Sequence, residues 1–491
     1  MRFYFRSTLV IFIFATLAAC NNAPPSADNS TPAQPAITKI AVIATANPTP
    51  LTPTPESITV YDRYTVRNGD TLGAISARYN ISIDDLMRIN GLANPNSLFV
   101  GQQLKIPSQV SLTALSDKLL PDSELVYSPA YASFDVNAVV NQSNGYLAGY
   151  REKVEGEMLT GAQIIQLVAE RYSIGPRVLL ALLEFQGSWV TSSTLSQNQI
   201  SYPMGLIDPS RQGLFYQTSW TANHLNEGYY GKLTGRLVAL RFKNGLRARV
   251  ASTANPGTVA IQNILAINST WDIWQNQIGN DGFIATYRKL FGDPGQYAIE
   301  PLIPPDLKQP ALHLPWSDGE MWYYTGGPHS GWGDYTAWSA VDFTPRDVLG
   351  SCLASRMWAI AAAPGKVIRA EHGRVIVSLI NNDFQGKGWA LMYMHMATAG
   401  RVSVGAIVNV GDHIGHPSCE GGVADSAHLH FARLYNGQWM GAEDSSMVLS
   451  GWTITALDQD YEGTMTRGTD SREACNCRDD AKNGVVADKG Q

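Results

Sequence analysis

The chain has 491 residues and a net charge of −6, with 44% hydrophobic and 16% charged residues. This length allows two to four domains, and the composition suits folded, soluble domains. Proteins that bind nucleic acid usually present a basic face, so the acidic balance gives no support to a nucleic-acid partner. The patterns described below predict a multidomain α+β protein.

The first twenty residues have the pattern of a secretory signal. Arg2 and Arg6 precede a short apolar run over 9–18, which is too short to span a membrane comfortably. The run ends in Leu-Ala-Ala-Cys at 17–20, which resembles the lipobox of bacterial lipoproteins. This resemblance implies a signal peptide over 1–19, lipid on Cys20, and export to the outer face of a bacterial membrane in the cell envelope. An ordinary signal peptide with a chance cysteine is the alternative.

The next segment, 20–58, is dominated by Pro, Ala, Thr, Ser and Asn. Such a stretch buries too little apolar surface to fold, and its prolines keep the chain extended. We expect a disordered tether between the lipidated cysteine and the first domain.

A compact strand-helix-helix-strand unit is expected over 62–107. A strand at 64–66 leads into an Asn-Gly-Asp turn, after which Asp70 or Thr71 can cap a helix. Apolar residues at helical spacing place a second helix over 83–89, ending near Asn90-Gly91, and a strand at 103–107 closes the unit.

Both ends of this unit, 64–72 and 100–107, resemble the LysM domain. The resemblance implies binding of glycan that contains N-acetylglucosamine, in a shallow groove between the loop after the first strand and the loop before the second. The residues at those positions are Gly69, Asp70, Thr71, Leu72, Asn94, Pro95 and Asn96. The alternative for Gly69 and Asp70 is that they only form the turn and the helix cap.

Residues 125–300 are expected to be mainly helical, because apolar residues recur at helical spacing over 164–169 and 178–189. The region faintly resembles the lysozyme-like lytic transglycosylases, which use a Glu at the end of an apolar helix as general acid. The best alignment puts Gln186 there, and Gln cannot donate that proton. Glu184 lies about 200° away around a helix. We expect Glu184 to be solvated or locally paired, and the region not to cleave glycan.

A Pro-rich linker is expected over 301–315, an all-β domain over 316–478 and a tail over 479–491. The β prediction rests on short alternating runs separated by glycine turns. His428 and His430 are two apart on one of these strands, so they share a face, while Leu429 and Phe431 point into packing. His395 is expected on another strand, on the face of Leu391. Asp342 lies near a further strand end.

The motifs of this region occur in the order found in the lysostaphin-type zinc metallopeptidases, which they resemble. The sequences are Val341-Asp342-Phe343, 361–367, Tyr393-Met394-His395, 411–415 and His428-Leu429-His430-Phe431. The family is one of murein hydrolases with a small β-sheet fold. The resemblance implies Zn²⁺ as cofactor, Asp342 and His430 as metal ligands, and His395 and His428 as the catalytic pair that handles the water proton and the oxyanion.

The first metal ligand departs from the family pattern. The family places a His four residues before the Asp, where this chain has Trp338. The nearest upstream histidine is His329, and we expect a Gly-rich inserted loop to return it to the metal, with Asp334 as the next candidate. The alternative is that His329 lies on a surface loop and the metal site is lost. The remaining histidines of the region are expected to be structural or exposed: His313, His372, His413 and His416.

Four cysteines follow Cys20, an even number for an oxidising compartment, so disulfides are expected. Cys352 lies just after the Asp342 strand and Cys419 in the loop leading to His428, so a bond between them would clamp two loops beside the site. Cys475 and Cys477 would then pair with each other or stay reduced.

These features together predict a lipid-anchored peptidoglycan hydrolase. It would bind wall glycan through the LysM unit and cleave amide bonds in peptidoglycan peptides as a zinc-dependent endopeptidase. One alternative is a non-catalytic peptidoglycan-binding lipoprotein that regulates other murein hydrolases, and another is an enzyme whose helical region acts on glycan strands. The presence of all five polar residues of the zinc site favours the endopeptidase.

Overall fold

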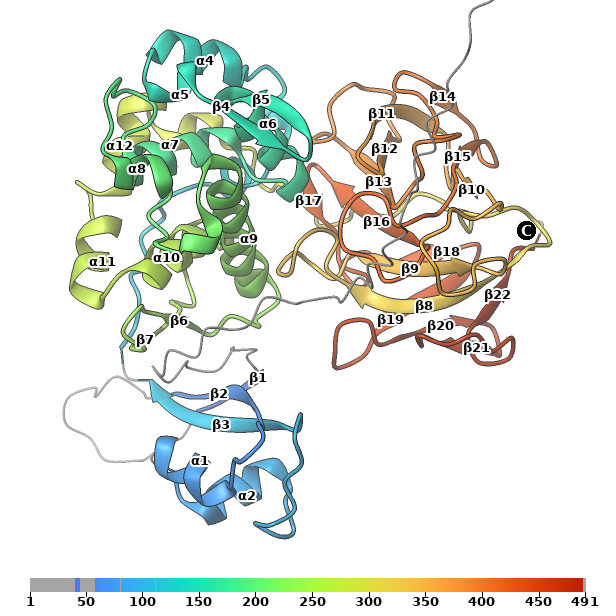
Figure 1. The fold of residues 1–491 in the computed structure, drawn as a ribbon, viewed down its shortest axis with the longest axis horizontal. Coiled ribbons are helices and arrows are strands. Elements are labelled where there is room, and N and C mark those ends of the chain that lie inside the picture. Colours follow the sequence, from blue (N-terminus) through green and yellow to red (C-terminus); the bar gives the residue numbers. More distant parts are fainter. Residues whose placement is uncertain (1–39, 45–57, 80, 111, 489–491) are drawn as a thin grey trace, which may run out of the picture.

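The computed structural model describes residues 40–44, 58–79, 81–110 and 112–488 (Figure 1). The expected signal peptide, Cys20 and most of the expected tether lie outside these residues. Within them, no helix is both long and apolar enough to cross a membrane.

The N-terminal unit has the expected strand-helix-helix-strand order. Strands β2 (Ile58–Thr65) and β3 (Gln103–Val110) pair antiparallel, and helices α1 (Leu72–Tyr79) and α2 (Ile83–Asn90) pack on them. The Thr71 hydroxyl accepts a hydrogen bond from the backbone N–H of Ala74, so Thr71 caps α1. Gly91, at φ +62°, ends α2 in a left-handed cap.

This unit is larger than expected at its N-terminal side. Strand β1 (Ile40–Ala44), within the segment expected to be a disordered tether, pairs antiparallel with β2, so the tether prediction is wrong there. The apolar Ile-Ala-Val-Ile run at 40–43 supplies residues that favour a strand, which the surrounding prolines obscure. The unit also contacts the helical region through an ion pair between Asp62 and Arg247.

The middle region is mainly helical, with two small hairpins. The first hairpin joins β4 (Arg151–Val154) to β5 (Glu157–Thr160), and the second joins β6 (Ala239–Arg241) to β7 (Arg247–Arg249). The longer helices are α6 (Gly161–Tyr172), α7 (Pro176–Gly187), α9 (Leu214–Leu233) and α10 (Pro256–Asn268). The shorter ones are α3 (Asp122–Leu125), α4 (Val136–Ser143), α5 (Tyr146–Gly149), α8 (Gln197–Ser201), α11 (Trp271–Ile278) and α12 (Phe283–Phe291).

The C-terminal region is rich in strands, as expected, and its main sheet holds nine strands within the described residues. Its central strands are β8 (Met321–His329), β9 (Ala340–Pro345), β16 (Leu429–Tyr435), β13 (Trp389–Met394), β12 (Arg374–Ser378) and β11 (Gly365–Glu371), in that spatial order. The outer members are β14 (Ile407–Val408), β17 (Gln438–Trp439) and β22 (Gly484–Val486). Strands β10 (Ala359–Ile360) and β15 (His413–Gly415) form a separate pair.

A second sheet is formed by β18 (Val448–Leu449), β19 (Trp452–Ala456), β20 (Gly463–Arg467) and β21 (Asp470–Glu473). The structure contradicts two predicted boundaries of this domain. Strand β22 pairs with β8, so Gly484–Val486, within the expected tail, belongs to the main sheet. Leu312 and Leu314 of the expected linker are buried, because apolar side chains between its prolines reach the β core.

The main sheet is covered on both faces. One face packs on the second sheet around residues such as Leu391, Leu429 and Phe431. The other face joins the hydrophobic core of the helical region through residues that include Met392 and Ala432. Hydrogen bonds also cross between the two regions, from the Trp439 backbone N–H to the Tyr230 hydroxyl at 2.9 Å and from the Tyr229 hydroxyl to Gln438 at 2.8 Å.

Candidate metal centre

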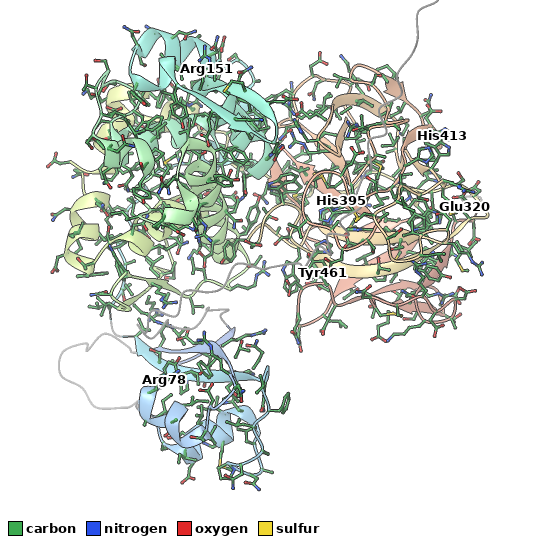
Figure 2. All side chains as sticks on the ribbon, viewed as in Figure 1. Arg78, Arg151, Glu320, His395, His413 and Tyr461 are labelled. Atoms are coloured by element: carbon green, nitrogen blue, oxygen red, sulfur yellow. A yellow bond between two sulfur atoms is a disulfide. The ribbon has the colours of Figure 1, made fainter. Side chains whose placement is uncertain are left out.

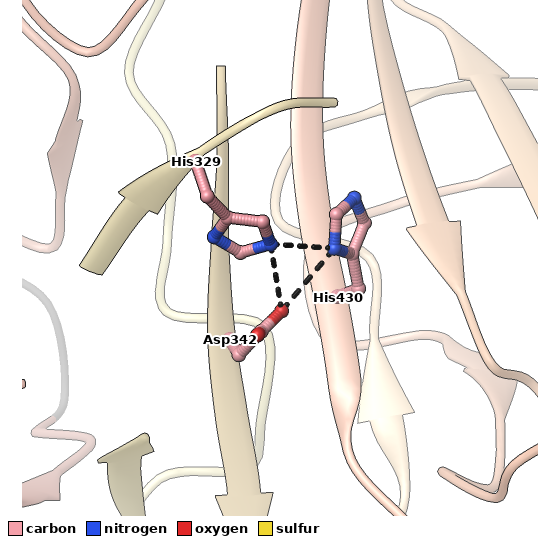
Figure 3. Close-up of side chains that lie close together, drawn as sticks. All are labelled: His329, Asp342 and His430. Atoms are coloured by element: carbon pink, nitrogen blue, oxygen red, sulfur yellow. Dashed lines mark hydrogen bonds and ion pairs between the residues drawn. The ribbon is translucent and has the colours of Figure 1, made fainter. Parts of the chain in front are cut away.

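Three side chains meet where β8, β9 and β16 lie side by side. The hairpin of β8 and β9 returns the chain so that His329 pairs with Ala340 and Gly326 with Asp342. On the other side of β9, His430 of β16 is directly opposite Asp342. The loop over 330–339 therefore separates His329 from Asp342 in sequence and leaves them adjacent in space, as expected (Figure 3).

The nitrogen atoms of the two rings converge on one carboxylate oxygen. Asp342 Oδ1 lies 3.4 Å from Nε2 of His329 and 3.2 Å from Nδ1 of His430. Those two nitrogen atoms are 3.0 Å apart. These residues form a group of side chains that could hold a metal ion.

Backbone carbonyl groups fix which ring nitrogen faces the centre. His329 Nδ1 donates to Gly327 O at 2.8 Å, and His430 Nε2 donates to Gly331 O at 3.1 Å. A carbonyl oxygen can only accept, so in the neutral form of each ring the proton lies on this outer nitrogen. The inner nitrogens then present lone pairs to each other and to Asp342, an arrangement that a cation stabilises.

The burial and charge of Asp342 support the same interpretation. Its side chain is 11% exposed, and Oδ1 has no hydrogen-bond partner among the described residues. Burial alone would raise the pKa of Asp342, but the charges of His329 and His428 hold it well below its usual range. Burial lowers the pKa of His430. Burial would lower the pKa of His329, but the charge of Asp342 raises it. A buried carboxylate beside two imidazoles is a donor set that suits a divalent metal such as zinc.

Glycine residues make room for this centre. A Cβ atom on Gly326 would lie 2.5 Å from Asp342 Oδ2, and one on Gly331 would lie 2.3 Å from Ser339 Oγ. Both distances are below those at which side chains pack, so larger residues would displace the acidic ligand or the loop that holds the Gly331 carbonyl.

His428 and His395 lie beside the three converging residues. His428 Nε2 is 3.7 Å from Asp342 Oδ1, and the ring centroids of His428 and His395 are 4.5 Å apart. Each ring donates its Nδ1 proton to a backbone carbonyl, His428 to Ser426 at 2.8 Å and His395 to Glu420 at 3.0 Å. Burial, followed by the rings of His428 and His430, lowers the pKa of His395 to about 3.

The backbone at His395 differs from the expected strand. Strand β13 ends at Met394, and His395 has φ +66°, a left-handed conformation that non-glycine residues rarely adopt. Strand alternation would place His395 with Leu391 in the core. The turn instead directs its ring toward His428, while Met396 joins the core cluster of Leu391. This strained residue is a feature that is typical of functional sites.

The sequence patterns did not reveal Tyr461, which lies against the metal centre. It belongs to the loop between β19 and β20 and is labelled in Figure 2. Its ring stacks on that of His329, with centroids 4.1 Å apart. Its carbonyl accepts from the Gly327 N–H at 2.8 Å, and it too has a positive φ, +65°. No local pattern marks it, because only the packing of the second sheet brings it to the site.

Other residues considered from the sequence lie elsewhere or in different roles. Asp334 accepts a hydrogen bond from Asn223 of α9 at 3.0 Å, and His372 lies near Glu155 of the helical region. Cys352 and Cys419 form the expected disulfide, with an S–S distance of 2.03 Å, and Cys475 is bonded to Cys477.

Most of the residues expected to bind sugar are accessible in the structure, and one of them is not. Asn94, Pro95 and Asn96 are exposed, as are Gly69 and Thr71. Leu72 is 2% exposed, so its side chain packs in the core and is not available to a sugar.

The Glu184 carboxylate accepts hydrogen bonds from the backbone of Val190 and Thr191 and from the Thr191 hydroxyl, which is the local pairing that was expected.

Three family models match the chain. The LysM domain model matches 64–107, the model described as LasA, N-terminal domain, matches 118–305, and the peptidase family M23 model matches 355–441. The middle region thus matches the LasA N-terminal domain, where the sequence had suggested lytic transglycosylases.

Individual relatives agree with these matches. Protease LasA of Pseudomonas aeruginosa is 27% identical over 297 residues, which cover 56% of this chain and 66% of LasA, so the chain spans just under two thirds of that relative. The cortical fragment-lytic enzyme of Bacillus subtilis is 46% identical over 44 residues, 9% of this chain and 10% of the enzyme.

Solved structures of M23 proteins also match. The M23 metalloprotease pseudoalterin, from the deep sea, is 25% identical, with 34% of this chain and 96% of that one covered and a TM-score of 0.28. The catalytic domain of lysostaphin from Staphylococcus simulans is 23% identical, with 25% and 88% covered and a TM-score of 0.17. From the family matches, the chain combines a LysM domain, a LasA N-terminal domain and a peptidase family M23 domain.

Proposed function

We propose that this protein is a zinc-dependent endopeptidase that hydrolyses amide bonds in peptidoglycan peptides. The observation that carries the proposal is the convergence of three buried side-chain atoms that could ligate a metal, with two further histidines beside them. Three protein ligands leave a coordination position free for water, as hydrolytic zinc sites require.

The proposed ligands are His329, Asp342 and His430. In the neutral rings the inner nitrogens carry lone pairs, because the outer nitrogens donate to backbone carbonyls, and the low pKa of Asp342 keeps its carboxylate ionised. When bound, zinc would polarise the scissile carbonyl and lower the pKa of the attacking water. The outer hydrogen bonds keep both rings in the orientation that ligation needs, which reduces the cost of binding the metal.

His428 and His395 are proposed to handle protons and charge at the scissile bond. In the neutral form of each ring the Nδ1 proton is held by a carbonyl, so the lone pair lies on Nε2. One Nε2 can therefore accept the proton of the attacking water and later pass it to the leaving amine. A ring that has gained a proton can also stabilise negative charge on the former carbonyl oxygen.

The other regions are proposed to hold the enzyme at its substrate. The LysM domain would bind wall glycan through its exposed loops, and lipid on Cys20 would anchor the chain to the outer face of a membrane. Both attachments raise the local concentration of peptide stems at the active site without contributing to the chemistry. Glu184, which is already paired with backbone N–H groups, is not proposed to cleave glycan.

Zinc content and hydrolysis measured on the same variants test this proposal. Purified wild-type protein should hold one zinc per chain and release peptide fragments from peptidoglycan. His329→Ala should lose both, whereas His428→Ala should keep zinc and lose hydrolysis. His372→Ala, at a histidine that lies beside Glu155 and is not one of the three converging residues, is the control for metal content. Zinc retained by His329→Ala would contradict the ligand assignment, and full activity in His428→Ala would contradict the proton-transfer role.

A further inference from the structure

One short segment of the β domain, residues 418–420, contacts both histidines of the proposed catalytic pair. His395, labelled in Figure 2, directly follows β13, and His428 directly precedes β16. An antiparallel bridge pairs Ser418 with His428 outside the named strands. Neither histidine lies within a regular strand, so contacts from this segment contribute to holding the two rings.

Ser418 supplies two hydrogen bonds to the backbone of His395. Its N–H donates to the His395 carbonyl at 2.6 Å, and its hydroxyl donates to the same carbonyl at 2.9 Å. His395 has φ +66°, a conformation that costs free energy in a non-glycine residue and persists only where the surrounding structure holds it. Two donors on one carbonyl fix the peptide group that follows His395 and so support this conformation.

The same hydroxyl holds the residue that orients the His395 ring. The Glu420 N–H donates to Ser418 Oγ at 3.0 Å, and the Glu420 carbonyl accepts from His395 Nδ1 at 3.0 Å. A hydroxyl group can donate one hydrogen bond and accept others, and Ser418 Oγ does both here. The Ser418 side chain therefore connects the backbone of His395 with the residue whose carbonyl faces its ring.

Ser418 also contacts the second histidine of the pair. The His428 N–H donates to the Ser418 carbonyl at 3.3 Å, and the His428 ring donates from Nδ1 to the Ser426 carbonyl at 2.8 Å. The ring centroids of His428 and His395 are 4.5 Å apart. A shift of Ser418 would therefore change the spacing of the two rings as well as the orientation of one of them.

The surroundings of Ser418 make it a fixed support. The residue is 3% exposed, and its neighbour Cys419 is bonded to Cys352. On the other side, the Pro417 carbonyl accepts a hydrogen bond from the Ser355 N–H at 2.8 Å. These contacts tie both neighbours of Ser418 to the loop of Cys352. All of these residues belong to the β domain, so the support does not involve the helical region.

We propose that Ser418 is a positioning residue that fixes the spacing and orientation of His395 and His428. The inference rests on the proposed function, since it concerns the proton transfer assigned to this pair, which requires both rings within hydrogen-bond reach of the reacting groups. The hydrogen bonds of Ser418 go to His395, Glu420 and His428, whereas the proposed zinc ligands are carried by β8, β9 and β16. Loss of the hydroxyl should therefore slow the reaction and leave zinc binding intact.

Ser418→Thr and Ser418→Val form a matched pair that tests this role, because both variants add similar bulk and only Thr keeps the hydroxyl. Ser418→Val should have a kcat on peptidoglycan peptides about tenfold below that of Ser418→Thr, the loss typical when the hydrogen-bonded support of a site histidine is removed. The KM should be the same in both, since the support acts on the reaction and not on substrate binding. Both variants should hold as much zinc as the wild type.

Two alanine variants complete the test. Ser418→Ala should show the same loss of kcat without added bulk, and it should also keep its zinc. Ser378→Ala is the control, because Ser378 is a buried serine of β12 whose Oγ has no hydrogen-bond partner among the described residues. It should keep the wild-type kcat.

Three results would overturn the inference while the proposed function stands. They are equal kcat in Ser418→Thr and Ser418→Val, wild-type kcat in Ser418→Ala, and a loss of zinc from Ser418→Ala that parallels its loss of activity. The last result would make Ser418 a support of the metal centre and not of the histidine pair. Absence of peptide hydrolysis by the zinc-loaded wild type would instead overturn the proposed function and this inference with it.

Discussion

Replacing Gly326 with Ala tests how closely the metal centre depends on the packing of β8 against β9. The added Cβ would lie 2.5 Å from Asp342 Oδ2 and 3.0 Å from both Cβ and Cγ of Asp342. Ordinary contacts begin near 3.4 Å, so the carboxylate or the strand must move by about 0.9 Å. Metal–ligand distances tolerate only about 0.2 Å, so the shift is large enough to disturb ligation.

Gly326→Ala is expected to lower both the stability of the protein and its affinity for zinc. Overpacking of this kind destabilises a protein by about 1–3 kcal/mol, which lowers Tm by about 2–4 °C per kcal/mol for a domain of this size. Displacing Asp342 should also weaken zinc binding by at least about tenfold, the loss typical when the support of a ligand is removed. Competition with a zinc chelator measures the affinity, and thermal unfolding of the metal-free protein measures the packing cost.

Gly149→Ala is the matched control, because a Cβ at Gly149 meets nothing within 4 Å and its φ is not positive. It should bind zinc like the wild type. Wild-type zinc affinity and an unchanged Tm in Gly326→Ala would refute the claim that this glycine makes room for the acidic ligand.

Four further predictions concern the Cys352 disulfide, the packing of the sheet on the helices, Glu184 and Cys20. Cys352→Ser should lower the free energy of unfolding by about 2–4 kcal/mol, and a thiol reagent should then label Cys419, the former partner. If reducing the wild-type protein left its free energy of unfolding unchanged, this prediction would be wrong. Met392→Asp, at a side chain 1% exposed on the sheet face that meets the helical region, should cost at least about 2 kcal/mol, whereas Met158→Asp, at a side chain 64% exposed, should cost little. Glu184→Gln should lower stability by about 1–2 kcal/mol and leave the glycan products from purified wall unchanged; loss of a wild-type glycan-cleaving activity in this variant would reverse the assignment. Cys20→Ala should shift the protein from the membrane fraction to the soluble fraction, and complete retention with membranes would count against lipidation.

Local sequence patterns were sufficient for the parts of the site that lie on regular strands. Alternation placed His428 and His430 together and Leu429 and Phe431 in the core, because a side-chain period of two holds from His428, the residue before β16, into that strand. The return of His329 to Asp342 was expected from the sequence, since a glycine-containing loop can bring the chain back, and the pairing of β8 with β9 places the two residues together. The small N-terminal unit was predictable for the same reason, as its helix caps and turns are local.

Contacts between distant segments could not be predicted in this way. The positive φ of His395 breaks the alternation of β13, and Tyr461 reaches the site only through the second sheet. The pairing of β22 with β8 joins residues that are far apart in sequence. The sequence carries one sign that helices cover the sheet. Strand β13 is apolar on both faces, a pattern typical of sheets that are covered on both sides.

Mass analysis of the fragments that the purified protein releases from intact peptidoglycan tests the central claim most directly. The account predicts new amino and carboxyl ends within stem or cross-bridge peptides, with glycan strands left uncut, and predicts that a zinc chelator abolishes them and added zinc restores them. His428→Ala should release no such fragments. Fragments with new sugar ends, or peptide cleavage that persists without metal, would contradict a zinc endopeptidase built on His329, Asp342 and His430.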